Sequence, residues 1–141
     1  MQVKDVMVRD VATLDIDDEL SLANDIMKLG RIRHLPVLSG KQLVGIVSER
    51  DLFRTSLVEA LGHEPFKTRE FMKAIRIQDI MVKKLITIGP EADIREAVQL
   101  MLAHKIGCVP VVVGGELLGL ITETDILRLY LEQLTAASPR G

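Results

Sequence analysis

The stretch GIVSERD, residues 45–51, returns 74 residues later as GLITETD, residues 119–125. Both read Gly, two aliphatic residues, Ser or Thr, Glu, one variable residue and Asp. The spacing of the hydroxyl and the Asp fits a capping box, in which the two side chains satisfy backbone N–H groups at a helix start. A helix start also suits a phosphate, and a nearby Asp can accept hydrogen bonds from a ribose diol. The stretch could therefore cap a helix, hold a nucleotide, or do both.

The repeat extends well beyond this stretch. Residues 3–53 align with residues 77–127 without a gap, and 14 of the 51 paired positions are identical. Many of the remaining pairs exchange one aliphatic residue for another. We therefore infer that the chain arose by duplication, which sets its architecture before any single element is considered.

Each repeat predicts the order strand, helix, strand, strand, helix. Short apolar runs suit the first strands, apolar residues at helical spacing follow, and glycine turns join the next two strands. Gly30 is placed to end the first of these helices. The first four elements are expected at 11–14, 17–30, 34–38 and 42–48, and again at 85–88, 92–107, 108–113 and 116–122. The last helix of each repeat is expected to begin at Ser48 or Thr122.

The repeats also predict the domain organisation. We expect a first unit at residues 1–56, a helical linker at 57–76, a second unit at 77–134 and a flexible tail at 135–141.

Composition favours a cytoplasmic globular protein. The 141 residues are 48% hydrophobic and 27% charged, and the net charge of −2 gives no basic footprint for nucleic acid or an anionic membrane. No apolar run approaches the ~18 residues that span a bilayer, and the first ten residues lack the apolar core of a signal peptide. The one cysteine, Cys108, fits a reducing compartment.

The duplicated sequence resembles the CBS domain, the module named after cystathionine β-synthase. The resemblance lies in VKDVMV and IQDIMV, in IRHLPVL and IGCVPVV, and in LVGIVSERDL and LLGLITETDI. Within this family the chain is similar to stand-alone prokaryotic tandem proteins, including those of the acetoin-utilisation type. The resemblance implies an α/β (α+β) fold, a Bateman module of two β-α-β-β-α units packed sheet to sheet with pseudo-twofold symmetry.

The resemblance also implies an adenosine ligand: AMP, ADP, ATP or S-adenosylmethionine. In such a module Asp51 and Asp125 would hold the ribose hydroxyls, while Ser48 and Thr122 would contact the ribose or a phosphate. No obligatory cofactor is implied.

The same resemblance places the base beside the predicted strands. The residues that would border it are two threonines and the backbone of two strand segments, namely Thr13, Thr87, Leu35, Pro36, Val109 and Pro110. Val8 and Val82 stand where many family members have Thr, a departure that removes one polar contact from the expected site.

The two repeats differ in charge near these positions. Arg33, His34 and Arg50 of the first repeat correspond to Gly107, Cys108 and Thr124 of the second. Any one of the three would ordinarily be a solvated surface residue. As a group beside a helix start, they lead us to expect that a phosphate-rich ligand favours the cleft that receives Arg33, His34 and Arg50.

No catalytic or metal-binding pattern accompanies the repeated motif. The histidines, His34, His63 and His104, lack metal-ligand spacing, and Cys108 is expected to be a small buried core residue. The sequence therefore predicts no enzyme. It predicts a regulatory module that senses adenine nucleotides and acts on a separate partner, with a ligand-free interaction scaffold as the alternative.

Apolar residues on the last helix of each repeat exceed what a small core needs. They are Leu52, Phe53 and Leu57 in the first repeat and Ile126, Leu127, Leu131 and Leu134 in the second. Surplus apolar surface of this kind usually marks an interface. We expect a homodimer built through the helices after Ser48 and Thr122.

Overall fold

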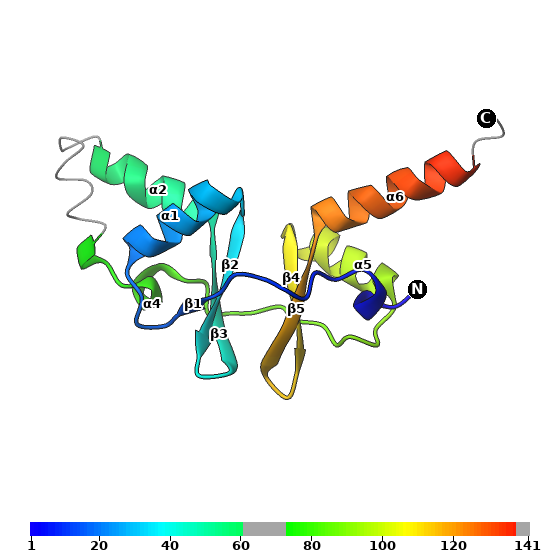
Figure 1. Cartoon of the computed structure of the whole chain (residues 1–141), viewed down its shortest axis with the longest axis horizontal. Coiled ribbons are helices and arrows are strands. Elements are labelled where there is room, and N and C mark those ends of the chain that lie inside the picture. Colours follow the sequence, from blue (N-terminus) through cyan, green and yellow to red (C-terminus); the bar gives the residue numbers. More distant parts are fainter. Residues whose placement is uncertain (61–72, 138–141) are drawn as a thin grey trace. The chain divides into compact units, whose positions relative to one another are not determined.

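The fold is seen in a computed structural model that describes residues 1–60 and 73–137, with side chains described except at 55–60. Residue contacts divide the chain into two compact units. Unit 1 comprises residues 1–11 and 86–141 and holds most of the second repeat, whereas unit 2 comprises residues 12–85 and holds most of the first. The chain is a mixed α/β protein (Figure 1).

Unit 2 contains a three-stranded arrangement with helices. Strand β1 runs parallel to β2, and β2 forms an antiparallel hairpin with β3. The elements are β1 (Leu14–Asp15), α1 (Leu20–Gly30), β2 (His34–Ser39), β3 (Gln42–Ser48), α2 (Glu49–Ala60) and α4 (Ile77–Ile80). The predicted order of strand, helix, strand, strand, helix is confirmed in this repeat.

Unit 1 repeats the hairpin and its two helices. The elements are η1 (Val3–Asp5), α5 (Ile94–His104), β4 (Cys108–Val113), β5 (Glu116–Thr122) and α6 (Glu123–Ala137), and β4 pairs with β5 in antiparallel fashion. The first strand expected at 85–88 is reduced to one parallel bridge between Ile88 and Val111. That prediction is therefore wrong in extent, because the apolar run at 85–88 pairs at a single residue.

Two predicted segments have different boundaries from the structure. Helix α6 continues through Ala137, so residues 135–137 of the expected flexible tail are helical, and the rest of the tail lies outside the described residues. The expected helical linker at 57–76 begins inside α2, and Lys73 and Ala74 are helical. Residues 61–72 lie outside the described part of the chain.

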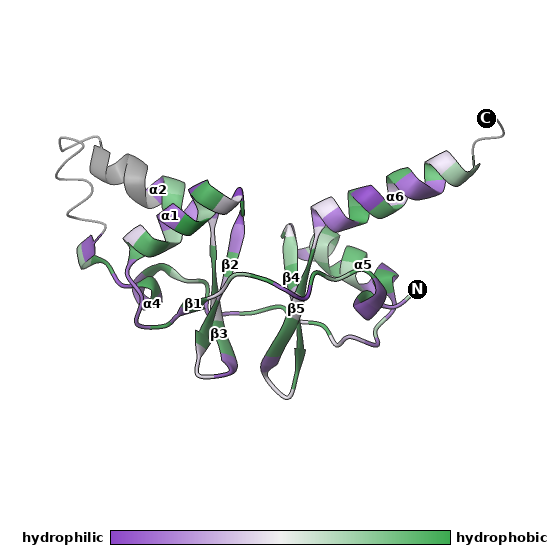
Figure 2. Ribbon diagram, viewed as in Figure 1, coloured by the Kyte–Doolittle hydropathy of each residue, from purple (hydrophilic) through white to green (hydrophobic). Residues whose placement is uncertain are grey.

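Each unit has its own apolar core. Figure 2 shows the hydrophobic residues of its strands and helices in green. In unit 2 the buried residues come from β1, α1, β2, β3, α2 and α4, and Leu20, Leu35 and Ile77 are fully enclosed. In unit 1 they come from η1, α5, β4 and β5, and include Val3, Val109 and Ile121. Burial of such side chains supplies most of the stabilisation of a domain of this size.

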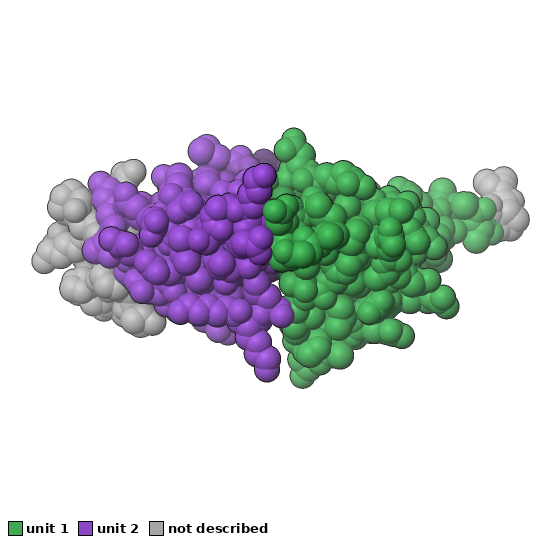
Figure 3. Space-filling view, turned by 90° about the horizontal axis from the view of Figure 1, so that it is seen from below, with its two compact units in different colours: residues 1–11, 86–141 green, residues 12–85 purple. Residues whose placement is uncertain are grey.

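The first segment of each repeat packs in the unit that holds most of the other repeat. Figure 3 shows the two units in different colours. In unit 1 the N–H of Val3 donates to the carbonyl of Ala92 at 2.8 Å, and the N–H of Lys4 donates to Pro90 at 2.9 Å. In unit 2 the N–H of Ile77 donates to the carbonyl of Asp18 at 3.0 Å. The compact units therefore cross the repeat boundaries on which the domain prediction of 1–56 and 77–134 is based.

Candidate functional site

The predicted site residues of unit 2 gather where β2 begins and β3 ends. We call the border of the sheet that these strand ends form its edge. His34 begins β2 and pairs with Ser48, the last residue of the antiparallel β3. Thr13 directly precedes Leu14, which pairs with Val37 in parallel. Since β1 and β2 run in the same direction, Thr13 lies toward the edge that holds His34 and Ser48.

At this edge Ser48 and Asp51 form the expected capping box. Ser48 donates to Asp51 Oδ2 through its backbone N–H at 3.1 Å and through its hydroxyl at 2.8 Å. The N–H of Asp51 in turn donates to Ser48 Oγ at 3.1 Å. The hydroxyl and the carboxylate thus fix the start of α2, and the capping role inferred from the spacing is confirmed.

Unit 1 contains the same arrangement at Thr122 and Asp125. Thr122 donates to Asp125 Oδ2 through its N–H at 2.8 Å and its hydroxyl at 2.9 Å, while the N–H of Asp125 lies 3.4 Å from Thr122 Oγ1. Asp125 is only 6% exposed and is the one buried charged residue in the described part of the chain. A buried carboxylate needs such partners, and its Oδ1 also lies 3.5 Å from Nη1 of Arg128.

The helix starts offer fewer open donors than a bare helix end. The N–H of Glu49 donates to the carbonyl of Arg33 at 2.8 Å, and the N–H of Glu123 donates to Gly107 at 3.0 Å. With the N–H of Asp51 and Asp125 bound to the capping hydroxyls, two of the first three N–H groups of each helix are already used. Too few backbone N–H groups therefore remain to bind a phosphate by themselves, and a bound phosphate would also need side-chain donors.

The glycine of each motif is explained by the chain itself. A Cβ at Gly45 would overlap the side chain of Met81, and a Cβ at Gly119 would overlap the backbone carbonyl of Val8. These contacts arise because Val82 and Val8 pair with the strands through two backbone hydrogen bonds each, to Ile46 and to Leu120. Glycine inside a strand often marks a close approach of another group, and here a neighbouring segment of the chain makes that approach.

The residues expected beside the base divide into two groups. The side chains of Leu35, Pro36, Val109 and Pro110 are buried, so only their backbone is available to a ligand. The carbonyl of Pro110 already accepts a hydrogen bond from the N–H of Ile88 at 3.0 Å. Thr13 and Thr87 are exposed.

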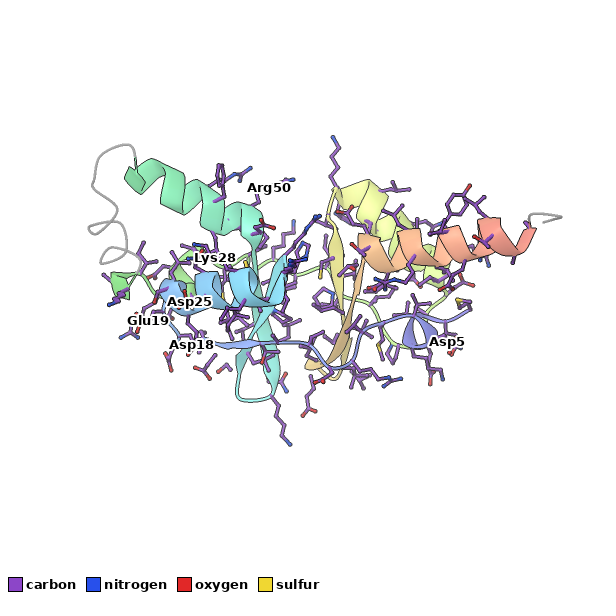
Figure 4. All side chains as sticks on the ribbon, turned by 45° about the horizontal axis from the view of Figure 1, so that its top comes forward. Asp5, Asp18, Glu19, Asp25, Lys28 and Arg50 are labelled. Carbon is purple, nitrogen blue, oxygen red and sulfur yellow. The ribbon has the colours of Figure 1, made fainter. Side chains whose placement is uncertain are left out.

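The charged residues of the predicted site differ between the two units. Arg33 and Arg50 are exposed, and Arg50 projects from the first turn of α2 (Figure 4). His34 is half-buried, whereas its counterpart Cys108 is buried. Burial, and to a lesser degree the charge of Asp125, raises the pKa of the Cys108 thiol to about 12, so Cys108 is a protonated core residue at neutral pH.

Two contacts at this edge were not predicted from the sequence. The ion pair of Arg128 with Asp125 has a sequence signal, because Arg at i+3 from an Asp lies on the same helix face, and Arg54 stands at the matching position of the first repeat. The contact of the Glu123 carboxylate with Gly107 has none, since it depends on how β4 and α6 meet in three dimensions.

The described residues contain no group of three or more His, Cys, Asp or Glu side chains that could hold a metal ion. His63 lies outside them. No described helix is long and apolar enough to cross a membrane.

Comparison with known proteins decides the family. The family model of the CBS domain matches residues 3–58 and residues 77–132. The chain belongs to the CBS domain family. The two matches coincide with the two sequence repeats, so this protein is a tandem CBS pair.

Solved CBS proteins share the fold of the whole pair. AcuB from Vibrio cholerae, a protein named for acetoin utilization, is 31% identical with a TM-score of 0.79, over 96% of this chain and 93% of that one. The CBS domain pair of protein MJ0100, solved in complex with 5′-methylthioadenosine and S-adenosyl-L-methionine, is 25% identical with a TM-score of 0.77. That match covers 92% of this chain and 99% of the other.

A curated relative is a much longer protein. Inosine-5′-monophosphate dehydrogenase of Korarchaeum cryptofilum is 36% identical over 121 residues, which is 85% of this chain but 22% of the enzyme. The CBS pair thus spans about a fifth of that relative, and the activity of the whole enzyme does not follow from the match.

Proposed function

We propose that this CBS pair is a regulatory module that binds an adenosine compound and acts on a separate protein partner. The observation that carries the proposal is the hydroxyl–carboxylate pair that both units place at the same edge of their strands, Ser48 with Asp51 and Thr122 with Asp125. The adenosine compounds bound by the CBS pair of MJ0100 support this class of ligand. The ligand is AMP, ADP, ATP or S-adenosylmethionine, and no other cofactor is required.

In this proposal each Asp keeps one carboxylate oxygen on the helix cap and offers the other to a ribose diol. In unit 1 this means that Asp125 Oδ1 exchanges its 3.5 Å contact with Arg128 for a ribose hydroxyl. Ser48 and Thr122 stand beside the ribose or phosphate, Thr13 and Thr87 near the base. The backbone of residues 35–36 and 109–110 borders the base, because their side chains are buried in the core.

The role proposed for the pair is binding, not catalysis. The polar groups of the motif are committed to holding a helix start, which suits recognition more than proton transfer. A bound ligand can then change the output only through its different affinity for two arrangements of the protein. We further propose that the module works in the cytoplasm as a homodimer joined through α2 and α6.

The proposal is tested by calorimetric titration of AMP, ADP, ATP, S-adenosylmethionine and NAD into the wild type and the Asp51→Ala and Asp125→Ala variants. Hydrogen bonds to a charged acceptor contribute roughly 1.5–3 kcal/mol, so each variant should weaken its own site by about ten- to a hundredfold. The variant with the weaker binding identifies which site each ligand occupies.

Asp93→Ala is the matched control. Asp93 caps α5 by accepting from the N–H of Arg95 at 2.8 Å, and it lies outside the proposed site. This variant loses a helix cap and keeps the ribose contacts, so the titrations should not change. If the motif only caps α2 and α6, Asp51→Ala and Asp125→Ala will behave like Asp93→Ala, with lower stability and unaltered or absent binding.

A ligand-free interaction scaffold is the second candidate function. It is favoured by one observation: the capping boxes are complete without any ligand, and α6 exposes Leu127, Tyr130, Leu131 and Leu134. Absence of binding for every compound in the titration, together with a stable homodimer, would establish this alternative.

A further inference from the structure

The two proposed sites differ in charge at matched positions, and this difference bears on which ligand each one takes. Position 33 of the first repeat is Arg, and its counterpart is Gly107. Position 50 is Arg, and its counterpart is Thr124. The edge of unit 2 therefore carries two positive charges that the edge of unit 1 lacks, while both keep the Glu and the Asp of the helix start.

The placement of the two arginines suits a ligand anion beside Ser48. The carbonyl of Arg33 accepts the N–H of Glu49 at 2.8 Å, which holds Arg33 directly against the first turn of α2. Arg50 belongs to that same turn (Figure 4). Both side chains are exposed, so their guanidinium groups are free to approach a phosphate in two-point contacts without first leaving a core.

Unit 1 places a negative charge where unit 2 presents Arg33. Oε1 of Glu123 lies 2.8 Å from the point that a Cβ would occupy on Gly107. The carboxylate thus occupies the space in which a side chain at position 107 would begin. Only glycine leaves room for this arrangement unless the Glu123 side chain moves.

The other substitutions around Gly107 remove side chains that can carry a positive charge. Cys108 replaces the half-buried imidazole of His34 with a buried thiol, and Thr124 replaces Arg50. Three further charged positions have the same sign in both units. Asp125, its partner Arg128 on α6 and Lys105 at the end of α5 match Asp51, Arg54 and Arg31 in unit 2. At separations below a Debye length of about 10 Å, such differences in charge affect the binding of a doubly charged phosphate.

We propose that the two sites are selective for different adenosine compounds, because Arg33 and Arg50 recognise a 5′-phosphate in unit 2, whereas the carboxylate of Glu123 beside Gly107 repels it in unit 1. This inference rests on the proposed function and names the ligand class of each site. Unit 2 takes an adenosine nucleotide such as AMP. Unit 1 takes an adenosine compound without a phosphate, such as a nucleoside, a thioether or a sulfonium.

Adenosine and AMP test this directly, because they differ only by the phosphate. The Asp125→Ala variant leaves the site of unit 2 to be titrated alone. There, Arg33→Gln with Arg50→Gln should lower the affinity for AMP roughly tenfold, the effect of losing a charge-assisted hydrogen bond, and leave the affinity for adenosine unchanged. Lys41→Gln, which removes an exposed charge at the far hairpin end of β2 and β3, should alter neither affinity.

The Asp51→Ala variant leaves the site of unit 1. There, Glu123→Gln keeps the shape of the side chain and removes its charge, so the affinity for AMP should rise severalfold and that for adenosine should stay constant. Glu116→Gln, at the exposed start of β5, is the control for loss of a surface glutamate and should leave both affinities unchanged.

The outcomes separate the inference from the function on which it rests. If both sites bind AMP and adenosine in the same ratio, and neither the arginine nor the Glu123 variants change that ratio, the inference is overturned and the adenosine-binding function stands. If the wild type binds neither compound, the proposed function fails and the selectivity fails with it.

Discussion

At the residue scale, the repeated motif performs more tasks than its spacing alone indicates. The hydroxyl and the Asp cap a helix, as the sequence predicts, and Gly45 and Gly119 accommodate the segments that cross β3 and β5. The sequence also favours a close approach at these glycines. It does not identify the approaching group, because Val8 and Val82 lie far from the motifs along the chain.

The nature of that contact predicts a difference between the two glycines. Gly119→Ala should destabilise the protein by about 2 kcal/mol or more, because the new methyl group meets the carbonyl of Val8, which is fixed by two hydrogen bonds to Leu120. Gly45→Ala should cost about 1 kcal/mol, since the group it meets is the flexible side chain of Met81. Chemical denaturation of each variant measures both values.

Gly89→Ala serves as the control for replacing a glycine. A Cβ at Gly89 meets nothing within 4 Å, so this change should be neutral or slightly stabilising. Equal losses for Gly45→Ala and Gly119→Ala would contradict the distinction between a movable side chain and a fixed backbone.

At the element scale, local patterns predicted most of the secondary structure. The hairpins form as expected around Gly40 and around Gly114 and Gly115, which have positive φ. The end of α1 was predicted only in part. Gly30 is its last residue, as expected, but the residue with left-handed backbone conformation is the next one, Arg31. The N–H of Ile32 returns to the carbonyl of Met27 at 3.2 Å and its side chain packs on the core, so burial of Ile32 offsets the strain at Arg31.

The same limit applies to the expected strand at 85–88. An apolar run predicts burial, but whether it forms a ladder depends on how far it follows its neighbour. Ile88 bonds to Pro110 and Val112 on either side of Val111 and is buried, while Thr87 is exposed. A single buried residue is therefore enough to explain the apolar signal without a continuous strand.

Helix α6 has an exposed apolar surface that should mediate dimerisation. Leu127, Tyr130, Leu131 and Leu134 are 51–66% exposed and follow one another at spacings of three, one and three residues, so they line one face of the helix. A contiguous exposed apolar surface of this kind usually marks an interface. Leu127→Glu with Leu131→Glu should convert the dimer to a monomer, because the charges cannot be buried in an apolar interface. Light scattering at micromolar concentration gives the mass of each form.

Leu29→Glu is the matched control, since Leu29 on α1 is 88% exposed and lies outside the proposed interface. Its mass should equal that of the wild type. A monomeric wild type, or a double variant that remains a dimer, would show that α6 does not form the interface. Side chains of Leu57 and its neighbours in α2 lie outside those described, so the test rests on α6.

At the scale of the whole molecule, the chain exchanges short segments between its repeats. Val3 and Ile77 stand at equivalent positions of the two repeats, yet Val3 is buried with α5, β4 and β5, and Ile77 is buried with α1, β2 and β3. Self-alignment reveals which positions are equivalent, but it cannot reveal which core each one joins. Which core each segment joins depends on the path of the connecting chain. The sequence therefore predicted the repeats correctly but did not predict the exchange of their first segments.

The exchange predicts that a core substitution at the start of one repeat will loosen the other. Val3→Ala removes a fully buried side chain from the unit 1 core and should cost about 2 kcal/mol. Hydrogen exchange followed by mass spectrometry should then show faster exchange in α5, β4 and β5, with α1, β2 and β3 less affected. Ile77→Ala should do the reverse, with the loss of protection centred on residues 20–48.

Val113→Ala, a truncation at an exposed position of β4, supplies the baseline for a change without core loss. If Val3→Ala instead accelerates exchange in β2 and β3, the N-terminal segment stabilises its own repeat and the division into compact units is wrong. If both core variants loosen the two units equally, the units unfold as one cooperative body. The expected crossed pattern would mean that each CBS repeat depends for its stability on the first segment of the other, so that neither repeat, cut at its sequence boundary, contains all of its own core.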